Sequence, residues 1–238
     1  MSTKYFLLLK SDKSIEEIEK DQIVYPNSNQ VYILPQVNID YYSKKGLFES
    51  QLIEWAKQLC SKDKVFLDIG AHTGTYSISL ATSAKHVYAF EPQKMSYYAL
   101  CGSVALSNIQ NITCLQFGLG SRDQVGVKTL KIVSNDGGGS SMHANSGILR
   151  EEQIKVDTLD RFQISDIGFI KMDVEENELY VLQGAEETLR RSNYPKILFE
   201  SNSDSGDVAK RLFEYLTETL QYRVIQIYGS SNMYLAER

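Results

Sequence analysis

The chain has 238 residues and a mass of 27.0 kDa, which favours one globular domain with a short terminal extension over two full domains. Apolar residues make up 42% and charged residues 23%, a composition that excludes collagen-like and wholly disordered chains. Lys and Arg number 25 against 30 Asp and Glu, a net charge of −5. This balance lacks the basic surplus that binds phosphates, so nucleic acid is disfavoured as a partner.

The cysteines and the N-terminal apolar run bear on the cellular compartment. Cys60, Cys101 and Cys114 are scattered and odd in number, which argues against a disulfide framework or a zinc cluster and indicates reduced thiols. The apolar run Tyr5–Leu9 stops at Lys10, too short for a signal peptide or a membrane span. We therefore expect a cytoplasmic protein without membrane association.

Residues 1–45 form an N-terminal extension to a domain that we place at residues 46–238. Apolar runs predict strands over residues 4–9 and 31–34, and an acidic stretch predicts a short helix over residues 14–20. We expect the extension either to cap the acceptor side of a site or to form a homodimer contact.

Strands and helices alternate through the rest of the chain, which indicates an α/β fold with a doubly wound, mostly parallel sheet. A helix over residues 48–59 precedes a strand (65–69), a glycine turn and a helix (76–81). The next elements are expected at 86–90 (strand), 95–106 (helix), 112–117 (strand), 167–172 (strand), 176–191 (helix), 196–199 (strand) and 207–220 (helix). An antiparallel hairpin, 224–228 with 233–236, closes the sheet.

An inserted hairpin is expected between the two halves, from strands over residues 125–133 and 153–159. The Gly- and Ser-rich residues 134–141 follow its first strand. Such a loop inside a compact domain is either a substrate lid or a mobile link.

The turn after the first strand of the sheet indicates which cofactor it would hold. Ligands of open α/β sheets bind at the carboxyl ends of the strands, where Asp68 and Glu91 lie, and Gly70 and Gly74 permit close approach. Glu91 is positioned to accept the two hydroxyls of a ribose. The carboxylate of Asp68 would repel a pyrophosphate, whereas it would attract an ammonium and a sulfonium. This charge pattern favours S-adenosylmethionine over NAD.

The segments VFLDIGAHTGTYS, VYAFEP, KVDTLDRF, FIKMDVEENELYVLQGAEETL and ILFES resemble the FkbM family of S-adenosylmethionine-dependent methyltransferases, in the family's order. The resemblance runs from about Phe48 to Ser201. It implies the class I, Rossmann-like fold with a seven-stranded sheet, and methyl transfer to a hydroxyl, often on a sugar. One position departs from the family: Glu176 stands where family members usually carry a glycine after DVE.

The resemblance also implies which residues hold the cofactor. Asp68, Gly70, His72, Gly74 and Thr75 would hold its methionine part. Glu91, followed by Pro92, would hold the ribose, and Gln116, Phe117 and Gly118 the adenine. Glu49 matches an acidic position upstream that touches the cofactor.

A base must take the proton of the acceptor hydroxyl. Lys171, Asp173 and Glu175 alternate at the end of a strand and share one face, with Asp173 beside the cofactor. We expect Asp173 first and Glu175 second to act as base or to orient the acceptor; alternatively, both cap the next helix. Lys171 is expected to pair with a carboxylate.

Further candidates lie outside this face. His143, in the Gly- and Ser-rich lid, is a third catalytic candidate if the lid closes over the acceptor, because imidazole transfers protons near neutral pH; alternatively it faces solvent. Glu200 could reach the acceptor or serve as a partner for Ser201 or Ser203. No histidine pair has the spacing of metal ligands, and we predict no metal, although Asp173 with other acids could hold magnesium.

The leading hypothesis is thus an O-methyltransferase that acts on a small-molecule or carbohydrate hydroxyl. One alternative is a ribose 2′-O-methyltransferase of RNA, and a second is a cofactor-binding module with a degenerate acceptor site. The pairs Tyr41-Tyr42 and Tyr97-Tyr98 are either stacking platforms for a sugar or the edges of the core.

Overall fold

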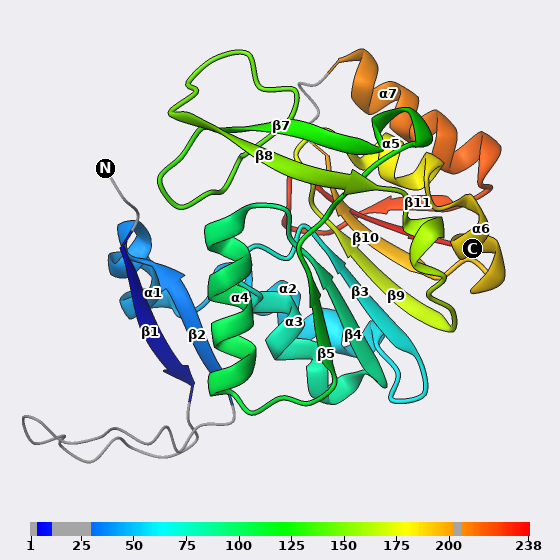
Figure 1. The fold of residues 1–238 in the computed structure, drawn as a ribbon. Helices are drawn as coiled ribbons and strands as arrows, with labels where there is room; N and C mark the ends of the chain where they lie inside the picture. Colours follow the sequence, from blue (N-terminus) through cyan, green and yellow to red (C-terminus); the bar gives the residue numbers. More distant parts are fainter. Residues whose placement is uncertain (1–3, 11–29, 202–205) are drawn as a thin grey trace, which may run out of the picture.

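The structure, a computed structural model, describes residues 4–10, 30–201 and 206–238 and is built around a seven-stranded sheet (Figure 1). The strand order is β11-β12-β10-β9-β3-β4-β5, and only β12 runs antiparallel to its neighbours. The strands are β3 (Val65–Ile69), β4 (His86–Phe90), β5 (Ile112–Leu115), β9 (Ile167–Met172), β10 (Lys196–Glu200), β11 (Arg223–Gln226) and β12 (Met233–Glu237). This arrangement confirms the expected doubly wound sheet, and the last strand of the hairpin inserts between β10 and β11.

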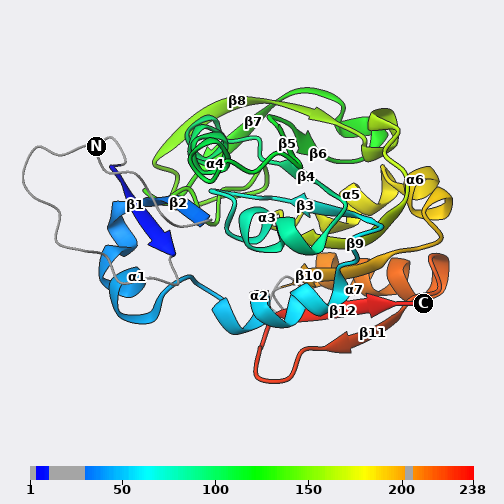
Figure 2. The ribbon, with the colours of Figure 1, turned by 90° about the horizontal axis from the view of Figure 1, so that it is seen from below.

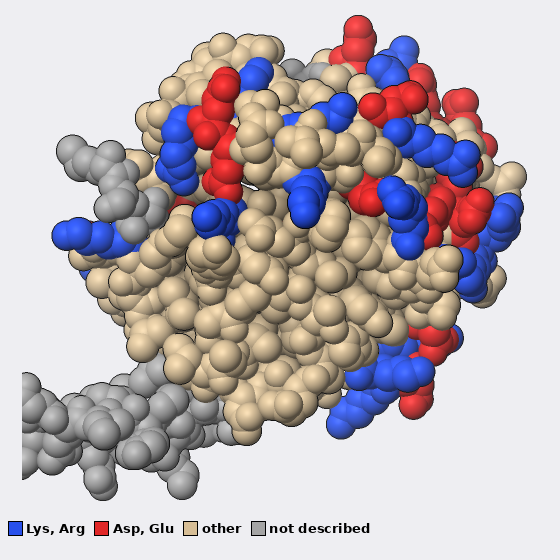
Figure 3. Space-filling view, in the orientation of Figure 1, with Lys and Arg blue, Asp and Glu red and all other residues tan. Residues whose placement is uncertain are grey.

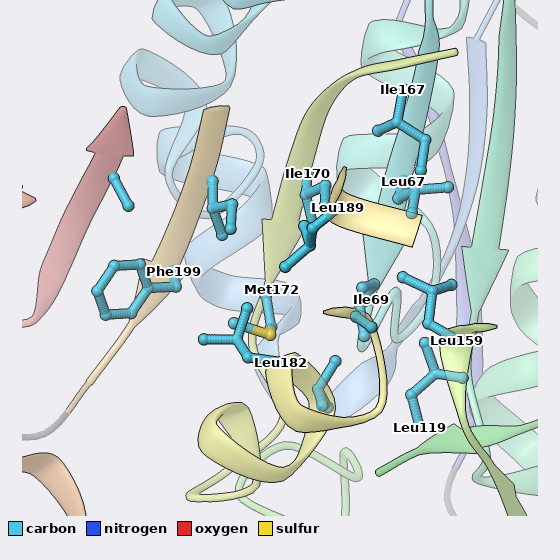
Figure 4. Close-up of a cluster of buried hydrophobic side chains, with 14 of the residues drawn as sticks. Leu67, Ile69, Leu119, Leu159, Ile167, Ile170, Met172, Leu182, Leu189 and Phe199 are labelled. Carbon is cyan, nitrogen blue, oxygen red and sulfur yellow. The ribbon is translucent and has the colours of Figure 1, made fainter. Parts of the chain in front are cut away.

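Helices cover both faces of the sheet, because successive side chains of each buried strand point to opposite sides. Phe66 points to the face that packs on α2 (Ser50–Ala56) and α3 (Thr75–Leu80), and α4 (Lys94–Leu106) covers the same face. Leu67 and Ile69 point to the opposite face, with Ile170 and Met172 of β9 beside them (Figure 4). That core is closed by α5 (Glu178–Gln183), α6 (Glu186–Arg191) and α7 (Asp207–Glu214).

The expected inserted hairpin is present as β7 (Gly126–Ile132) and β8 (Arg150–Asp157), and it crosses above the carboxyl ends of the parallel strands (Figure 1). The expected strand over residues 112–117 ends at Leu115. The chain then continues as β6 (Gly118–Leu119), which pairs with β8 in a separate three-stranded sheet. The hairpin is therefore joined to the main sheet by the segment that follows β5.

The expected single helix over residues 176–191 is two helices, α5 and α6, and begins later than predicted. Glu175 and Glu176 have φ values of 53° and 73°, which no helix accommodates. At the break, a Cβ on Gly184 would lie 2.0 Å from the carbonyl oxygen of Gly120. Close backbone approach to the β6 region thus separates the two helices.

The N-terminal extension packs on the domain through β1 (Tyr5–Lys10), β2 (Gln30–Pro35) and α1 (Ile39–Lys45), as Figures 1 and 2 show. Two backbone N–H groups of β2, on Val31 and Ile33, donate to the hydroxyls of Ser107 and Ser103 on α4, at 2.8 and 2.9 Å. Leu34 is fully buried. The helix expected over residues 14–20 lies outside the described residues. Within the described residues, no helix is long and apolar enough to cross a membrane.

Candidate active site

A cavity with about 230 Å³ of space opens at the carboxyl ends of the parallel strands, under the β7–β8 hairpin. Ten of the fourteen residues that were predicted to be catalytic or to bind the cofactor line it, whereas Asp68, Gly74, Gln116 and His143 do not. The ten are Glu49, Gly70, His72, Thr75, Glu91, Pro92, Phe117, Gly118, Asp173 and Glu175. The switch point of the sheet therefore assembles most of the expected site.

The turn from β3 to α3 forms one wall of the cavity and requires glycine. Gly70 has a φ of +77°, and a Cβ there would lie 1.8 Å from the carbonyl oxygen of Asp173. The N–H groups of Gly70 and Ala71 both donate to the carbonyl of Phe90, at 3.0 and 2.9 Å. Gly74, with a φ of +89°, faces Leu100 and serves packing. The turn is thus fixed against the ends of β4 and β9.

Glu91 lies at the end of β4 with both carboxylate oxygens held by backbone groups. His72 N–H and Gln93 N–H donate to Oε2 and Oε1, each at 2.8 Å. Burial raises the pKa of Glu91 to about 7, although both hydrogen bonds favour the charged form. The carboxylate is therefore oriented before any ligand arrives, with lone pairs left to accept hydroxyl groups.

Asp68 is fully buried behind the turn and does not reach the cavity. Its Oδ2 accepts from Ser77 Oγ at 2.5 Å, and within the described part of the chain its Oδ1 has no hydrogen-bond partner. Burial raises the pKa of this carboxyl, although the charge of Lys171 opposes the shift. An orphaned carboxyl oxygen beneath the turn is a free acceptor that favours a hydrogen-bond donor or a positively charged group above it.

The opposite end of the cavity is apolar. Phe117 and Gly118 line it with the buried chains of Leu119 and Ile154, whereas Gln116 points outward and is exposed. Pro92 lies beside Gly118. This end suits a flat aromatic group, and the lining runs from it through Glu91 to Asp173.

The acidic face at the end of β9 is built around Lys171. The Lys171 ammonium is buried and donates to Asp173 Oδ2 at 3.3 Å and to the Gly70 carbonyl at 3.2 Å, so the expected pairing is confirmed. Burial would lower the pKa of Lys171, but the charges of Asp173 and Asp68 outweigh it and raise the pKa. Asp173 lines the cavity with one oxygen committed to this ion pair.

Glu175 does not continue the strand as expected, because its φ is 53°. Its Oε1 accepts from Gly139 N–H at 3.0 Å, and its carbonyl accepts from Ser141 Oγ at 2.8 Å. Burial and the charge of Asp173 raise the pKa of Glu175. At the start of α5, Glu178 is the side chain that accepts a backbone N–H, from Val174 at 3.0 Å, so neither Asp173 nor Glu175 acts as the helix cap.

The Gly-rich loop, residues 134–141, lies over the cavity and is tied down at both ends. Asp136 accepts from Asn38 Nδ2 at 2.7 Å, and its carbonyl lies 2.7 Å from His72 Nε2. Burial lowers the pKa of His72, which favours the neutral ring. Together with the bonds to Glu175, these contacts join the loop to the extension, to the β3–α3 turn and to the β9–α5 connection. These contacts hold the loop over the cavity in this structure.

The mouth of the cavity is aromatic and acidic. Tyr76 OH donates to Glu49 Oε2 at 3.0 Å, and the ring of Phe48 stacks on Tyr41 with centroids 4.0 Å apart. Tyr42 also lines the cavity, whereas Tyr97 and Tyr98 do not. Sequence reasoning missed Tyr76 and Phe48 because helical periodicity assigned both to the core.

His143 and Glu200 lie away from this mouth. His143 does not line the cavity; its Nε2 lies 3.0 Å from Asn177 Oδ1 and its ring stacks on Tyr180. Glu200 accepts from Asn232 Nδ2 rather than from Ser201, and it lines a small adjacent hollow with Asp173 and Glu175. Within residues 4–10, 30–201 and 206–238, no three His, Cys, Asp or Glu side chains are grouped to hold a metal ion.

Charged side chains are unevenly distributed on the face drawn in Figure 3. Acidic and basic groups mingle over the β7–β8 hairpin, whereas the area over α4 and β5 is mostly uncharged. The described residues form no continuous basic stripe on this face.

Comparison with known proteins agrees with this geometry. The model of the methyltransferase FkbM domain matches residues 68–224. The hexuronic acid methyltransferase AglP of Haloferax volcanii is 26% identical over 168 residues, 70% of this chain and 68% of that protein. A tRNA/tmRNA (uracil-C(5))-methyltransferase of Pseudoalteromonas atlantica is 30% identical over 104 residues, but these span only 28% of that protein and 42% of this chain.

Solved structures show the same fold. A Streptococcus mutans protein in complex with SAH superposes with a TM-score of 0.52 at 12% identity, covering 79% of this chain and 96% of its own. Precorrin-6y C5,15-methyltransferase of Geobacter metallireducens superposes with a TM-score of 0.50 at 12% identity, covering 81% of this chain and 88% of its own. Fold and family match together define a class I, S-adenosylmethionine-dependent methyltransferase. The chain belongs to the FkbM methyltransferase family.

Proposed function

We propose that the protein transfers the methyl group of S-adenosylmethionine to a hydroxyl of a carbohydrate acceptor. The observation that carries the proposal is the position of Asp173, which lines the cavity directly beside the β3–α3 turn and is oriented by Lys171 at 3.3 Å. The similarity to a hexuronic acid methyltransferase supports a sugar as acceptor.

The lining of the cavity fits the cofactor from end to end. The apolar end at Phe117 and Gly118 would take the adenine, and Glu91, already oriented by two N–H groups, would accept the ribose hydroxyls. The turn from Gly70 to Thr75 would take the methionine part, close to the orphaned oxygen of Asp68. Glu49 lies at the same wall.

The cofactor supplies an activated methyl group, so the protein has two tasks: to align the acceptor oxygen and to remove its proton. Asp173 Oδ2 is held by Lys171, which leaves Oδ1 to accept the hydroxyl proton. Glu175 lies on the same side and would orient the acceptor, and its raised pKa suits a second proton acceptor. The Gly-rich loop above them would exclude water.

We place the acceptor beside the N-terminal extension. Tyr42 of α1 lines the cavity, and Asn38 holds the Gly-rich loop through Asp136. These two contacts support a role for residues 30–45 as a cap over the acceptor.

The first test is calorimetric titration of S-adenosylmethionine and S-adenosylhomocysteine, with NAD as the control ligand. We expect affinities near the micromolar range, on the order of −8 kcal/mol, and a loss of about tenfold or more in Glu91→Ala. Failure of both sulfur ligands to bind would overturn the proposal. Binding without methyl transfer to any hydroxyl acceptor would indicate a degenerate module instead.

The second test separates the candidate bases in a methyl-transfer assay. Asp173→Asn should lower kcat by about a hundredfold or more while S-adenosylhomocysteine still binds, because a positioned base contributes that much. His143→Asn should change kcat by less than about threefold, since His143 does not line the cavity and its ring is held by Asn177 and Tyr180. The reverse ranking would transfer the role of base to His143.

A further inference from the structure

The charged groups around the cavity are almost all acidic. Glu49, Glu91, Asp173 and Glu175 line it, and among the described lining residues Lys171 is the only lysine or arginine. Lys171 is 5% exposed and already donates to Asp173 and to the Gly70 carbonyl. Its ammonium is therefore not available to an incoming anion.

The excess of negative charge extends to the neighbouring hollow. Glu200 lines it together with Asp173, Glu175 and Glu178. Burial and the charges of Asp173, Glu175 and Glu49 raise the pKa of Glu200 to about 8, and Lys171 only partly offsets them. These acidic groups thus already disfavour one another's ionisation, so an anion brought in beside them would meet the same repulsion.

The mouth offers an uncharged means of holding an acceptor. Phe48 lines the cavity and is 39% exposed, and Tyr41, 40% exposed, stacks on it at an interplanar angle of 19°. The apolar C–H face of a sugar ring packs on such a surface. The carboxylates of Glu49 and Glu175 would accept hydrogen bonds from the hydroxyl groups at the edge of the ring.

We propose that the acceptor is a sugar ring without an anionic group, neutral or amine-bearing, that packs on Phe48 and Tyr41. A hexuronic acid, the substrate class in the name of the Haloferax volcanii relative, is thereby disfavoured. This inference rests on the proposed function and goes further by assigning the charge of the acceptor. Its basis is the surplus of carboxylates over the single, already paired ammonium.

The test uses matched pairs of methyl glycosides with the gluco, galacto and manno configurations. Each pair contains the hexoside and its uronide, which differ only at C6. Binding to the protein loaded with S-adenosylhomocysteine is measured by saturation-transfer NMR and titration. We expect at least one hexoside to bind about tenfold or more tightly than its uronide. A uronide that binds as tightly as its hexoside, or the absence of binding by every hexoside, would overturn the inference.

Two variants locate the acceptor. Tyr41→Ala, which removes the ring stacked on Phe48, should weaken hexoside binding by about fivefold or more, whereas Tyr98→Ala, which removes an exposed tyrosine paired with Tyr97, should not. Equal effects of the two would overturn the aromatic platform. Binding of S-adenosylhomocysteine is measured separately. If S-adenosylhomocysteine does not bind, the proposed function fails. If it binds but a uronide is preferred over its hexoside, only the inference on the charge of the acceptor fails.

Discussion

The two sides of the cavity are built by different means. On the turn side, formed by residues 70–75 and the end of β4, neighbouring backbone groups fix one another: Gly70 and Ala71 bind the Phe90 carbonyl, and His72 binds Glu91. On the loop side, distant segments meet through side chains, such as Asn38 with Asp136. The turn side is therefore fixed by backbone contacts between neighbouring parallel strands, whereas the loop side depends on side-chain contacts that can change without disturbing it.

The largest effect is expected on the turn side, from Gly70→Ala. The new Cβ would meet the Asp173 carbonyl at 1.8 Å, so the turn must move away from β9. We expect the free energy of unfolding to fall by about 3 kcal/mol or more, measured by urea denaturation. Gly147→Ala is the matched control, because Gly147 also has a positive φ (+67°) but nothing lies within 4 Å of its Cβ position. Gly147→Ala should lower the free energy of unfolding by only about 1 kcal/mol. Equal losses in the two variants would contradict the close approach of Gly70 to the Asp173 carbonyl.

The pH dependence of stability reports on two buried carboxyls, Glu91 on the turn side and Glu178 at the start of α5. The pKa values of Glu91 and Glu178 are both raised to about 7 by burial, above the ordinary value of 4.5. Between those values the folded protein binds more protons than the unfolded chain, so stability is greatest at low pH and is lost as the pH rises through the folded pKa.

Each of these two carboxyls should therefore contribute a fall of about 2 kcal/mol in the free energy of unfolding between about pH 5.5 and pH 8.5. Glu178→Gln and Glu91→Gln should each remove one such contribution from the curve, because each removes one titrating group. A stability that rises with pH over this range would show that these carboxyls are charged without penalty.

The turn side was predictable from the sequence for a physical reason. A strand end, a glycine-rich turn and an acidic residue after the next strand are local signals, and they correctly indicated the fold and the turn that forms one wall of the cavity. The contacts of Gly70 with Asp173 and of Glu91 with His72 follow from the parallel register of β3, β4 and β9.

The loop side was not predictable in the same way. The order of the Gly-rich loop depends on Asn38 and on Glu175, 98 and 36 residues away from their partners in sequence. His143 was expected in the site because of its chemistry, yet Asn177 and Tyr180 hold its ring outside the cavity. Nothing in one sequence specifies which of several polar side chains such a loop will meet.

A smaller effect is expected at Asn38, which binds the loop through Asp136 at 2.7 Å. Asn38→Ala should lower the free energy of unfolding by about 1 kcal/mol and speed the release of S-adenosylhomocysteine, measured by stopped-flow fluorescence. Asn38→Asp should have a larger effect of the same sign, because it places two carboxylates together. If neither variant changes the release rate, the loop does not gate the cofactor.

The smallest effect is expected at Glu176, where the family usually has glycine. Its φ of +73° is a conformation that costs a side-chain-bearing residue about 1–2 kcal/mol, whereas glycine adopts it freely but loses more entropy on folding. Glu176→Gly should therefore raise the free energy of unfolding by only about 0.5 kcal/mol. Glu176→Gln keeps the positive φ and removes only the charge, so it should not reproduce this gain in stability. The opposite result would be that Glu176→Gln stabilises the protein more than Glu176→Gly does. That result would mean that the charge of Glu176, and not its backbone conformation, destabilises the fold.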